Sequence, residues 1–173
     1  FRSLENHTVE CWGYNEEGQL GLGNTNRIGD GPGEMGNSLA AVDLGTGRSV
    51  RSLSTGGVSF STCAILDNGQ LKCWGGNDRG ELGLGDMNPR GDEVGEMGDS
   101  LPAIDLGTGR TAKSVVTGYQ FTCAILDNGS VKCWGSNTDG QLGQGDYATR
   151  GDNGGEMGNN LSAIDLGAGR KAK

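Results

Sequence analysis

Pairs of carboxylates recur three times in the chain, each pair in a glycine-rich segment. The aspartate and glutamate of a pair are four residues apart, and the glutamate belongs to a Gly-Glu-Met-Gly sequence. The pairs are Asp30 and Glu34, Asp92 and Glu96, and Asp152 and Glu156. Carboxylate oxygens in such loops can hold Ca²⁺, which takes six to eight oxygen ligands. The spacing matches no calcium motif, so these residues are weak calcium candidates beside two alternatives, a solvated hydrogen-bonded loop and a protein contact surface.

Two cysteine pairs share a ten-residue separation, which is compatible with a short hairpin. A three-residue Asp67-Asn68-Gly69 loop, with its glycine in the left-handed conformation, places Cys63 opposite Cys73. A two-residue Asn-Gly loop would place Cys63 opposite Trp74 instead. Directly opposed cysteines at a non-hydrogen-bonded position have Cα atoms about 5 Å apart, within reach of a disulfide.

The spacing therefore predicts the disulfides Cys63–Cys73 and Cys123–Cys133, and free buried thiols are the alternative. The fifth cysteine, Cys11, aligns with the second member of a pair, but Phe1 occupies the position of its partner. We expect Cys11 to be a free thiol, unless the sequence at Phe1 is altered or truncated.

Three Asn-x-Ser/Thr sequons are compatible with a secreted protein, and we expect glycans at one or more of them. They begin at Asn6, Asn128 and Asn160, and the first two occupy equivalent hairpin tips. Disulfides persist mainly in oxidising compartments. Sequons and cysteines together predict an extracellular or cell-surface location.

Several function classes are disfavoured by composition. His7 is the only histidine, so a repeated nucleophile–histidine–acid set is excluded, Cys-His zinc spacing is absent, and we expect neither an enzyme nor a cofactor. With 14 basic and 22 acidic residues, the net charge of −8 disfavours nucleic acid as a partner. The sequence contains no apolar stretch of the length that a membrane span requires, so membrane insertion is not expected.

The motifs lie in a unit that repeats at roughly sixty-residue intervals, which is the strongest feature of the sequence. Each period contains segments that predict four short strands separated by glycine turns. One such set is Pro102–Leu106, Ala112–Val116, Phe121–Leu126 and Ser130–Trp134. Four antiparallel strands per repeat are typical of a β-propeller blade. We predict an all-β partial propeller over 1–173, with repeats at 1–48, 49–110 and 111–173.

A Trp-Gly-x-Asn-x-x-Gly-[Gln/Glu]-Leu-Gly core recurs at Trp12–Gly21, Trp74–Gly83 and Trp134–Gly143. This core, with the Cys-Ala-Ile-Leu-Asp-Asn-Gly hairpin before it, resembles the regulator of chromosome condensation repeat. The resemblance implies a seven-bladed propeller of which only part is present here. The paired cysteines look like the secreted branch of that family. We expect the three tryptophans to pack in the core or between blades.

These features predict a non-catalytic extracellular module with a structural or protein-interaction role. Its partners would be a protein or further blades of the same chain, and it could assemble into a larger complex. A secreted inhibitor or ligand-binding propeller is the alternative. Exchange on a small GTPase, a role implied by the resemblance, is disfavoured by the cysteines because it is intracellular.

Overall fold

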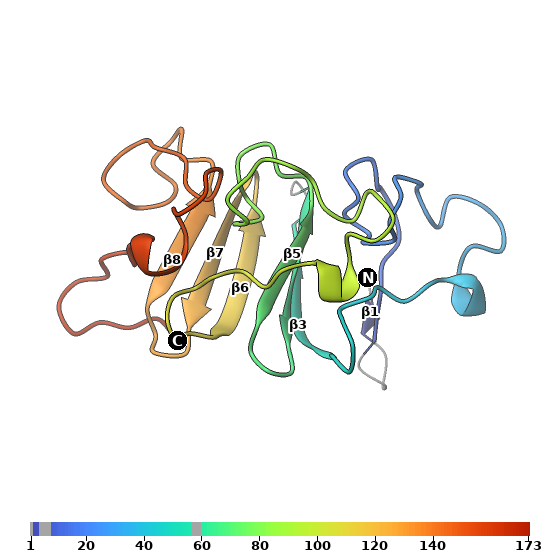
Figure 1. The fold of residues 1–173 in the computed structure, drawn as a ribbon, viewed down its shortest axis with the longest axis horizontal. Coiled ribbons are helices and arrows are strands. Elements are labelled where there is room, and N and C mark those ends of the chain that lie inside the picture. Colours follow the sequence, from blue (N-terminus) through green and yellow to red (C-terminus); the bar gives the residue numbers. More distant parts are fainter. Residues whose placement is uncertain (1, 4–7, 57–59) are drawn as a thin grey trace.

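Antiparallel sheets stand side by side in the computed structural model, which describes residues 2–3, 8–56 and 60–173 (Figure 1). The first sheet pairs β1 (Arg2–Ser3) with β2 (Val9–Glu10). The second has the order β3 (Val50–Thr55), β4 (Ser61–Leu66) and β5 (Leu71–Gly75). The third has the order β6 (Ala112–Gly118), β7 (Phe121–Leu126) and β8 (Val131–Gly135). Among the described residues, no helix is long and apolar enough to cross a membrane.

The predicted hairpin register is confirmed. Cys63 lies opposite Cys73 and Ile65 opposite Leu71, and the Leu66 N–H donates to the Gln70 carbonyl at 2.8 Å. The loop between them therefore holds three residues, with Gly69 at a φ of 81°. A left-handed conformation at this position is accessible to glycine at little steric cost, which is why the Asp-Asn-Gly sequence specifies the loop length and hence the register.

The prediction of a fourth strand at Pro102–Leu106 is wrong: the segment is not a regular strand, and it lies against the preceding sheet and not beside Ala112–Val116. This segment is irregular, and it contacts the preceding sheet through one hydrogen bond, in which the Ile104 N–H donates to the Leu71 carbonyl at 2.8 Å. Pro102 has no N–H to donate, and the Asp105 carboxylate accepts from the Gly107 N–H at 2.8 Å, which turns the chain away. Each larger sheet therefore has three strands.

The apolar core lies between neighbouring sheets as well as within them. One cluster joins the first sheet to the second, and another joins the second to the third. The first contains Val9, Leu20, Val42, Leu66 and Trp74. The second contains Ile65, Leu82, Ile104, Leu126 and Trp134. Because each cluster draws on two repeats, the burial of one repeat depends on its neighbour.

Short 3₁₀ turns and long loops connect the sheets. The 3₁₀ turns are η1 (Gly36–Ser38), η2 (Gly98–Ser100) and η3 (Gly158–Asn160). The loops 13–30, 76–97 and 136–157 gather at one end of the sheets, at the top of Figure 1. We call this end the loop face. The β4–β5 and β7–β8 turns, at 67–69 and 127–129, lie at the opposite end, which we call the tip face.

Candidate protein-binding surface

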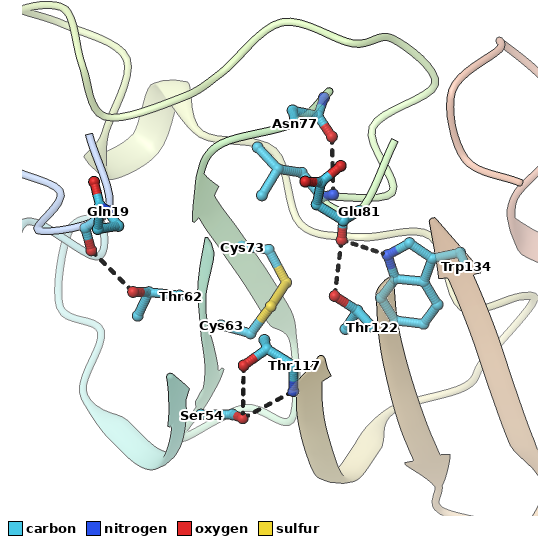
Figure 2. Close-up of a disulfide and its surroundings, with 11 residues drawn as sticks. Gln19, Ser54, Thr62, Cys63, Cys73, Asn77, Glu81, Thr117, Thr122 and Trp134 are labelled. Carbon is cyan, nitrogen blue, oxygen red and sulfur yellow. Dashed lines mark hydrogen bonds between the residues drawn. A yellow bond between two sulfur atoms is a disulfide. The ribbon is translucent and has the colours of Figure 1, made fainter. Parts of the chain in front are cut away.

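A tryptophan at the end of each complete hairpin fixes a loop of the preceding repeat. The Trp134 Nε1–H donates to the Glu81 carbonyl at 3.0 Å, and the Thr122 hydroxyl donates to the same oxygen at 2.9 Å (Figure 2). Trp134 is fully buried, so its hydrogen bond is shielded from water. One carbonyl of the second repeat thus anchors the third repeat at two points.

The same junction is found one repeat earlier. The Gln19 carbonyl accepts from the Thr62 hydroxyl at 2.9 Å and from the Trp74 indole at 3.1 Å. Gly21 leaves room for the Trp74 ring, since a Cβ built there would lie 2.7 Å from Nε1. Packing between repeats is therefore confirmed as the role of Trp74 and Trp134. The same expectation is wrong for Trp12, which is 38% exposed.

A buried asparagine holds each loop in shape. The Asn77 Oδ1 accepts from the Leu82 N–H at 2.9 Å (Figure 2). Its Nδ2 donates to the carbonyls of Asp86 and Asn88 at 2.9 and 3.0 Å. Asn15 makes the three corresponding bonds, and Asn137 makes those to the Asp146 carbonyl and the Leu142 N–H. This role was not predicted from the sequence, although an asparagine follows each tryptophan by three residues. The loop face consequently has a backbone fixed from inside.

The paired carboxylates close the next turn of each loop. The Glu96 Oε2 accepts from the N–H groups of Gly91 and Glu93 at 2.9 and 3.1 Å. Glu34 and Glu156 accept two backbone N–H groups in the same way. Those backbone bonds hold the pKa of Glu34 below its usual value.

The aspartates of two pairs are less well satisfied. Asp92 and Asp152 each bury one Oδ1 that has no hydrogen-bond partner. Burial raises the pKa of both carboxyls, and the neighbouring carboxyl of the paired glutamate, Glu96 or Glu156, raises it further. Asp30 lies at an exposed position in the first loop. In the part of the chain described, no group of three or more His, Cys, Asp or Glu side chains could hold a metal ion. The geometry is that of hydrogen-bonded loops.

The cysteines lie where the hairpins place them. Disulfides join Cys63 to Cys73 and Cys123 to Cys133, and the Cα atoms of each pair are 4.1 Å apart. Cys11 is a buried free thiol, and its burial raises its pKa to about 11. A thiol with that pKa is protonated near neutral pH and therefore weakly reactive.

Two of the predicted glycosylation positions are exposed. Asn128 lies at the β7–β8 tip, where its Oδ1 accepts from the Ser130 N–H and hydroxyl. Asn160 is exposed at the end of η3. Asn6 and the single histidine, His7, lie outside the described residues.

Comparison with known proteins places these repeats in a family context. Residues 50–81 and 112–141 match the regulator of chromosome condensation (RCC1) repeat. The chain is 36% identical over 141 residues to "RCC1 domain-containing protein RUG3, mitochondrial" from Arabidopsis thaliana, covering 80% of this chain and 28% of that protein. It is 30% identical over 150 residues to the ultraviolet-B receptor UVR8 of Arabidopsis thaliana, covering 82% and 28%. The chain thus spans little more than a quarter of these relatives.

Solved structures give the same result for the fold. The crystal structure of Prp20p from Saccharomyces cerevisiae superposes with a TM-score of 0.64 at 20% identity, over 95% of this chain and 36% of that one. Human WBSCR16 superposes with a TM-score of 0.63 at 18% identity, over 92% of this chain and 33% of that one. The sheets described above are thus blades of a β-propeller, and the chain spans about a third of these solved chains.

Proposed function

Because the chain is a member of the RCC1-repeat family, built as a stack of propeller blades, we propose that it is a non-catalytic protein-binding module. In this proposal the disulfide-tied blades act as a scaffold, and the loop face contacts the partner. Loops on a rigid framework commonly carry recognition, since their sequence can vary without loss of the core.

The observation that carries the proposal is the combination of a fixed backbone and exposed apolar side chains on the loop face. Met87, Val94 and Tyr147 are 57%, 92% and 76% exposed. Asn77 and Asn137 hold the backbone of the loops that contain Met87 and Tyr147, so little conformational entropy is lost when those side chains bind a partner. Large apolar side chains gathered at one end of a molecule are typical of interaction surfaces.

The fold neighbours support a role in protein binding. One neighbouring structure is described as Kap60 bound to yeast RCC1, and another as Prp20p with its binding properties to Gsp1p and histones. These partners belong to those proteins. For the present chain, this similarity favours a protein as the kind of partner. Which protein it is depends on the side chains of the loop face.

We also propose that the module works outside the cell or at its surface. The support is chemical: two cross-strand disulfides persist most readily in an oxidising compartment. Alkylation of the protein from its native source in denaturant, which exposes buried thiols, before and after reduction tests this directly. We expect Cys63, Cys73, Cys123 and Cys133 to react only after reduction. Reaction of these four thiols without reduction would contradict the proposal.

Photo-crosslinking tests the binding role. A benzoylphenylalanine at Val94 or Tyr147 samples the loop face, and the same residue at Asn68 or Asn128 samples the tip face. We expect a discrete protein adduct, in the native milieu, from the loop-face positions only. Equal labelling from both faces, or adducts from the tip face alone, would overturn the assignment of the surface.

A further inference from the structure

A groove opens between the first and second blades, where their loops lie side by side. Its volume is about 520 Å³, within the range of ligand sites in proteins. One wall contains Leu22 and Ile28 from the first loop, the other contains Val94 and Met97 from the second, and Leu39 contributes from the segment after η1. The Gly23 N–H donates to the Gly91 carbonyl at 3.0 Å, which ties the two walls together. The groove is therefore built entirely from described segments of this chain.

A related but poorer groove occurs at the next junction. It has a volume of about 240 Å³ and is lined by Leu84 and Met157, which match Leu22 and Met97. Asn153 and Gly154 stand where the first groove has Glu93 and Val94. The two junctions share a backbone plan and differ in these side chains, and also where Ile28 corresponds to Arg90 and Ala40 to Pro102. The second groove therefore serves as a partial reference for the first.

The first groove is strongly acidic. Glu34, Asp43 and Glu93 line it, and no lysine or arginine does. Within the described residues, none of these three carboxylates makes an ion pair. Backbone hydrogen bonds that lower the pKa of Glu34 keep it charged near neutral pH. A ligand that carries positive charge beside an apolar group would pair with these carboxylates and also contact the apolar side chains of the groove.

The shape of the groove favours a segment of a macromolecule. Val94 forms part of one wall and is 92% exposed, so that wall cannot enclose a small molecule. An extended peptide can instead place one side chain between the walls while its neighbours stay at the rim. Alternate residues of an extended chain point to opposite sides, which separates an inserted side chain from charged ones.

We propose that this groove binds an extended peptide segment in which a leucine-sized side chain is flanked by lysines and arginines. The proposal rests on the protein-binding role proposed above and names the chemistry of the partner. The apolar side chain lies against Leu22, Val94 and Met97, and the cationic groups face Glu34, Asp43 and Glu93. Glu93 and Val94 distinguish this groove from its counterpart.

The probe for the test is a fluorescein-labelled peptide, Gly-Ser-Arg-Lys-Leu-Arg-Lys-Ser-Gly, measured by fluorescence anisotropy. Two control peptides replace its leucine by serine or its four basic residues by glutamates. The protein variant Glu93→Asn with Val94→Gly gives the first groove the side chains of the second at these two positions. We expect that variant to bind at least about tenfold more weakly, equivalent to about 1.4 kcal/mol, with an unchanged melting temperature.

The reciprocal variant adds the side chains to the second groove. Asn153→Glu with Gly154→Val is sterically permitted, because a Cβ at Gly154 would meet nothing within 4 Å and its φ is not positive. We expect this protein to bind two peptides where the wild type binds one. Binding should weaken as salt is raised from about 0.05 to 0.5 M, since the Debye length shortens.

Three outcomes would overturn the proposal: no peptide binding, equal binding of the serine or glutamate control peptide, or unchanged binding by the Glu93→Asn, Val94→Gly variant. These results can be separated from a failure of the binding role itself. If crosslinks still form at Tyr147, away from this groove, the loop face binds a protein and only the peptide chemistry is wrong. If no crosslinks form anywhere on the loop face, the proposed function is wrong.

Discussion

At the scale of single residues, Gly83 and its contact with Trp134 determine how closely two blades approach. Gly83 has a φ of 70°, and a Cβ there would lie 2.7 Å from the indole Nε1. Gly143 occupies the same position in the next repeat with a φ of 65°, but its nearest neighbour is the Ile164 side chain at 3.4 Å. The two glycines share a backbone conformation and differ in what lies beside them.

We predict that Gly83→Ala destabilises the protein more than Gly143→Ala. Both substitutions incur the cost of a left-handed backbone, about 1–2 kcal/mol. Gly83→Ala also displaces Trp134, which adds about 1–3 kcal/mol of overpacking. Urea unfolding followed by tryptophan fluorescence measures the difference, and equal losses in the two variants would show that the indole contact is unimportant.

The partly buried carboxyl of Asp92 makes stability depend on pH. Its folded pKa is raised above the ordinary value of 3.8 by burial and by Glu96, so the folded state binds a proton more tightly than the unfolded state does. The resulting stabilisation is present in full below pH 3.8 and is lost as pH rises through the raised folded pKa. At neutral pH the charged group keeps one oxygen buried without a partner.

We therefore predict that Asp92→Asn has a higher melting temperature than the wild type at pH 7, and that this advantage shrinks as pH falls towards 4. The amide carries no charge, and it can donate to Glu96. Thermal melts of both proteins across this range give the difference, in which titrations common to both cancel. A variant less stable than the wild type at pH 7 would show that the charged form of Asp92 is favoured by the fold.

At the scale of elements, the β7–β8 hairpin is closed by both its turn and its disulfide. Removal of the bridge by Cys123→Ala with Cys133→Ala releases the unfolded chain from a short loop, which costs about 2–3 kcal/mol. We predict that loss in urea unfolding under non-reducing conditions. The same double variant compared with wild type in reducing buffer serves as the control, where the difference should largely vanish. If the double variant were as stable as the wild type under non-reducing conditions too, the bridge would contribute little to stability.

A buried lysine on β8 forms hydrogen bonds with two of the irregular segments that connect the sheets. The Lys132 ammonium donates to the Leu106 carbonyl at 3.0 Å and to the Gly158 carbonyl at 2.6 Å. Burial lowers the pKa of this ammonium. Lys72 makes the equivalent bonds one repeat earlier, to the carbonyls of Leu44 and Gly98. The irregular segments after the loops are thus held by a side chain in addition to the strand hydrogen bonds.

We predict that Lys132→Met destabilises the protein by about 1–3 kcal/mol, because two carbonyl groups lose a charged donor. Lys113→Met, at an exposed position of β6, should change stability by less than about 0.5 kcal/mol. Calorimetric melts of the two variants provide the comparison. If Lys132→Met were as stable as Lys113→Met, desolvation of the ammonium would cancel the value of its hydrogen bonds.

The elements differ in how far they could be predicted from sequence. The register of the hairpins was predictable to the residue, since a turn sequence and a cysteine pair each specify the same pairing. The strand bounds were less exact, because the expected strand Ser130–Trp134 is observed at Val131–Gly135. The segment Pro102–Leu106 was not, because its apolar residues alternate as in a strand while Pro102 and Asp105 divert its hydrogen bonds. The local pattern of apolar residues predicts which side chains are buried. It does not predict whether a neighbouring strand can form a complete ladder of backbone hydrogen bonds with the segment.

At the scale of the whole molecule, the blades form one scaffold whose two ends differ in character. The loop face carries the acidic groove and exposed apolar residues such as Val94, and the tip face carries short turns such as 67–69. The sequence predicted the acidic loops as a possible contact surface. It could not predict the groove, because Leu22 and Met97 come together only when two blades stack in register.

The central claim is that protein recognition occurs at the loop face of a scaffold that does not change. Hydrogen–deuterium exchange of the protein, alone and with the partner identified by crosslinking, tests this most directly. We predict slower exchange on binding at 20–24 and 91–97, with β4, β5, β7 and β8 unchanged and already protected. Protection confined to the tips at 67–69 and 127–129, with the loop face unaffected, would contradict the claim.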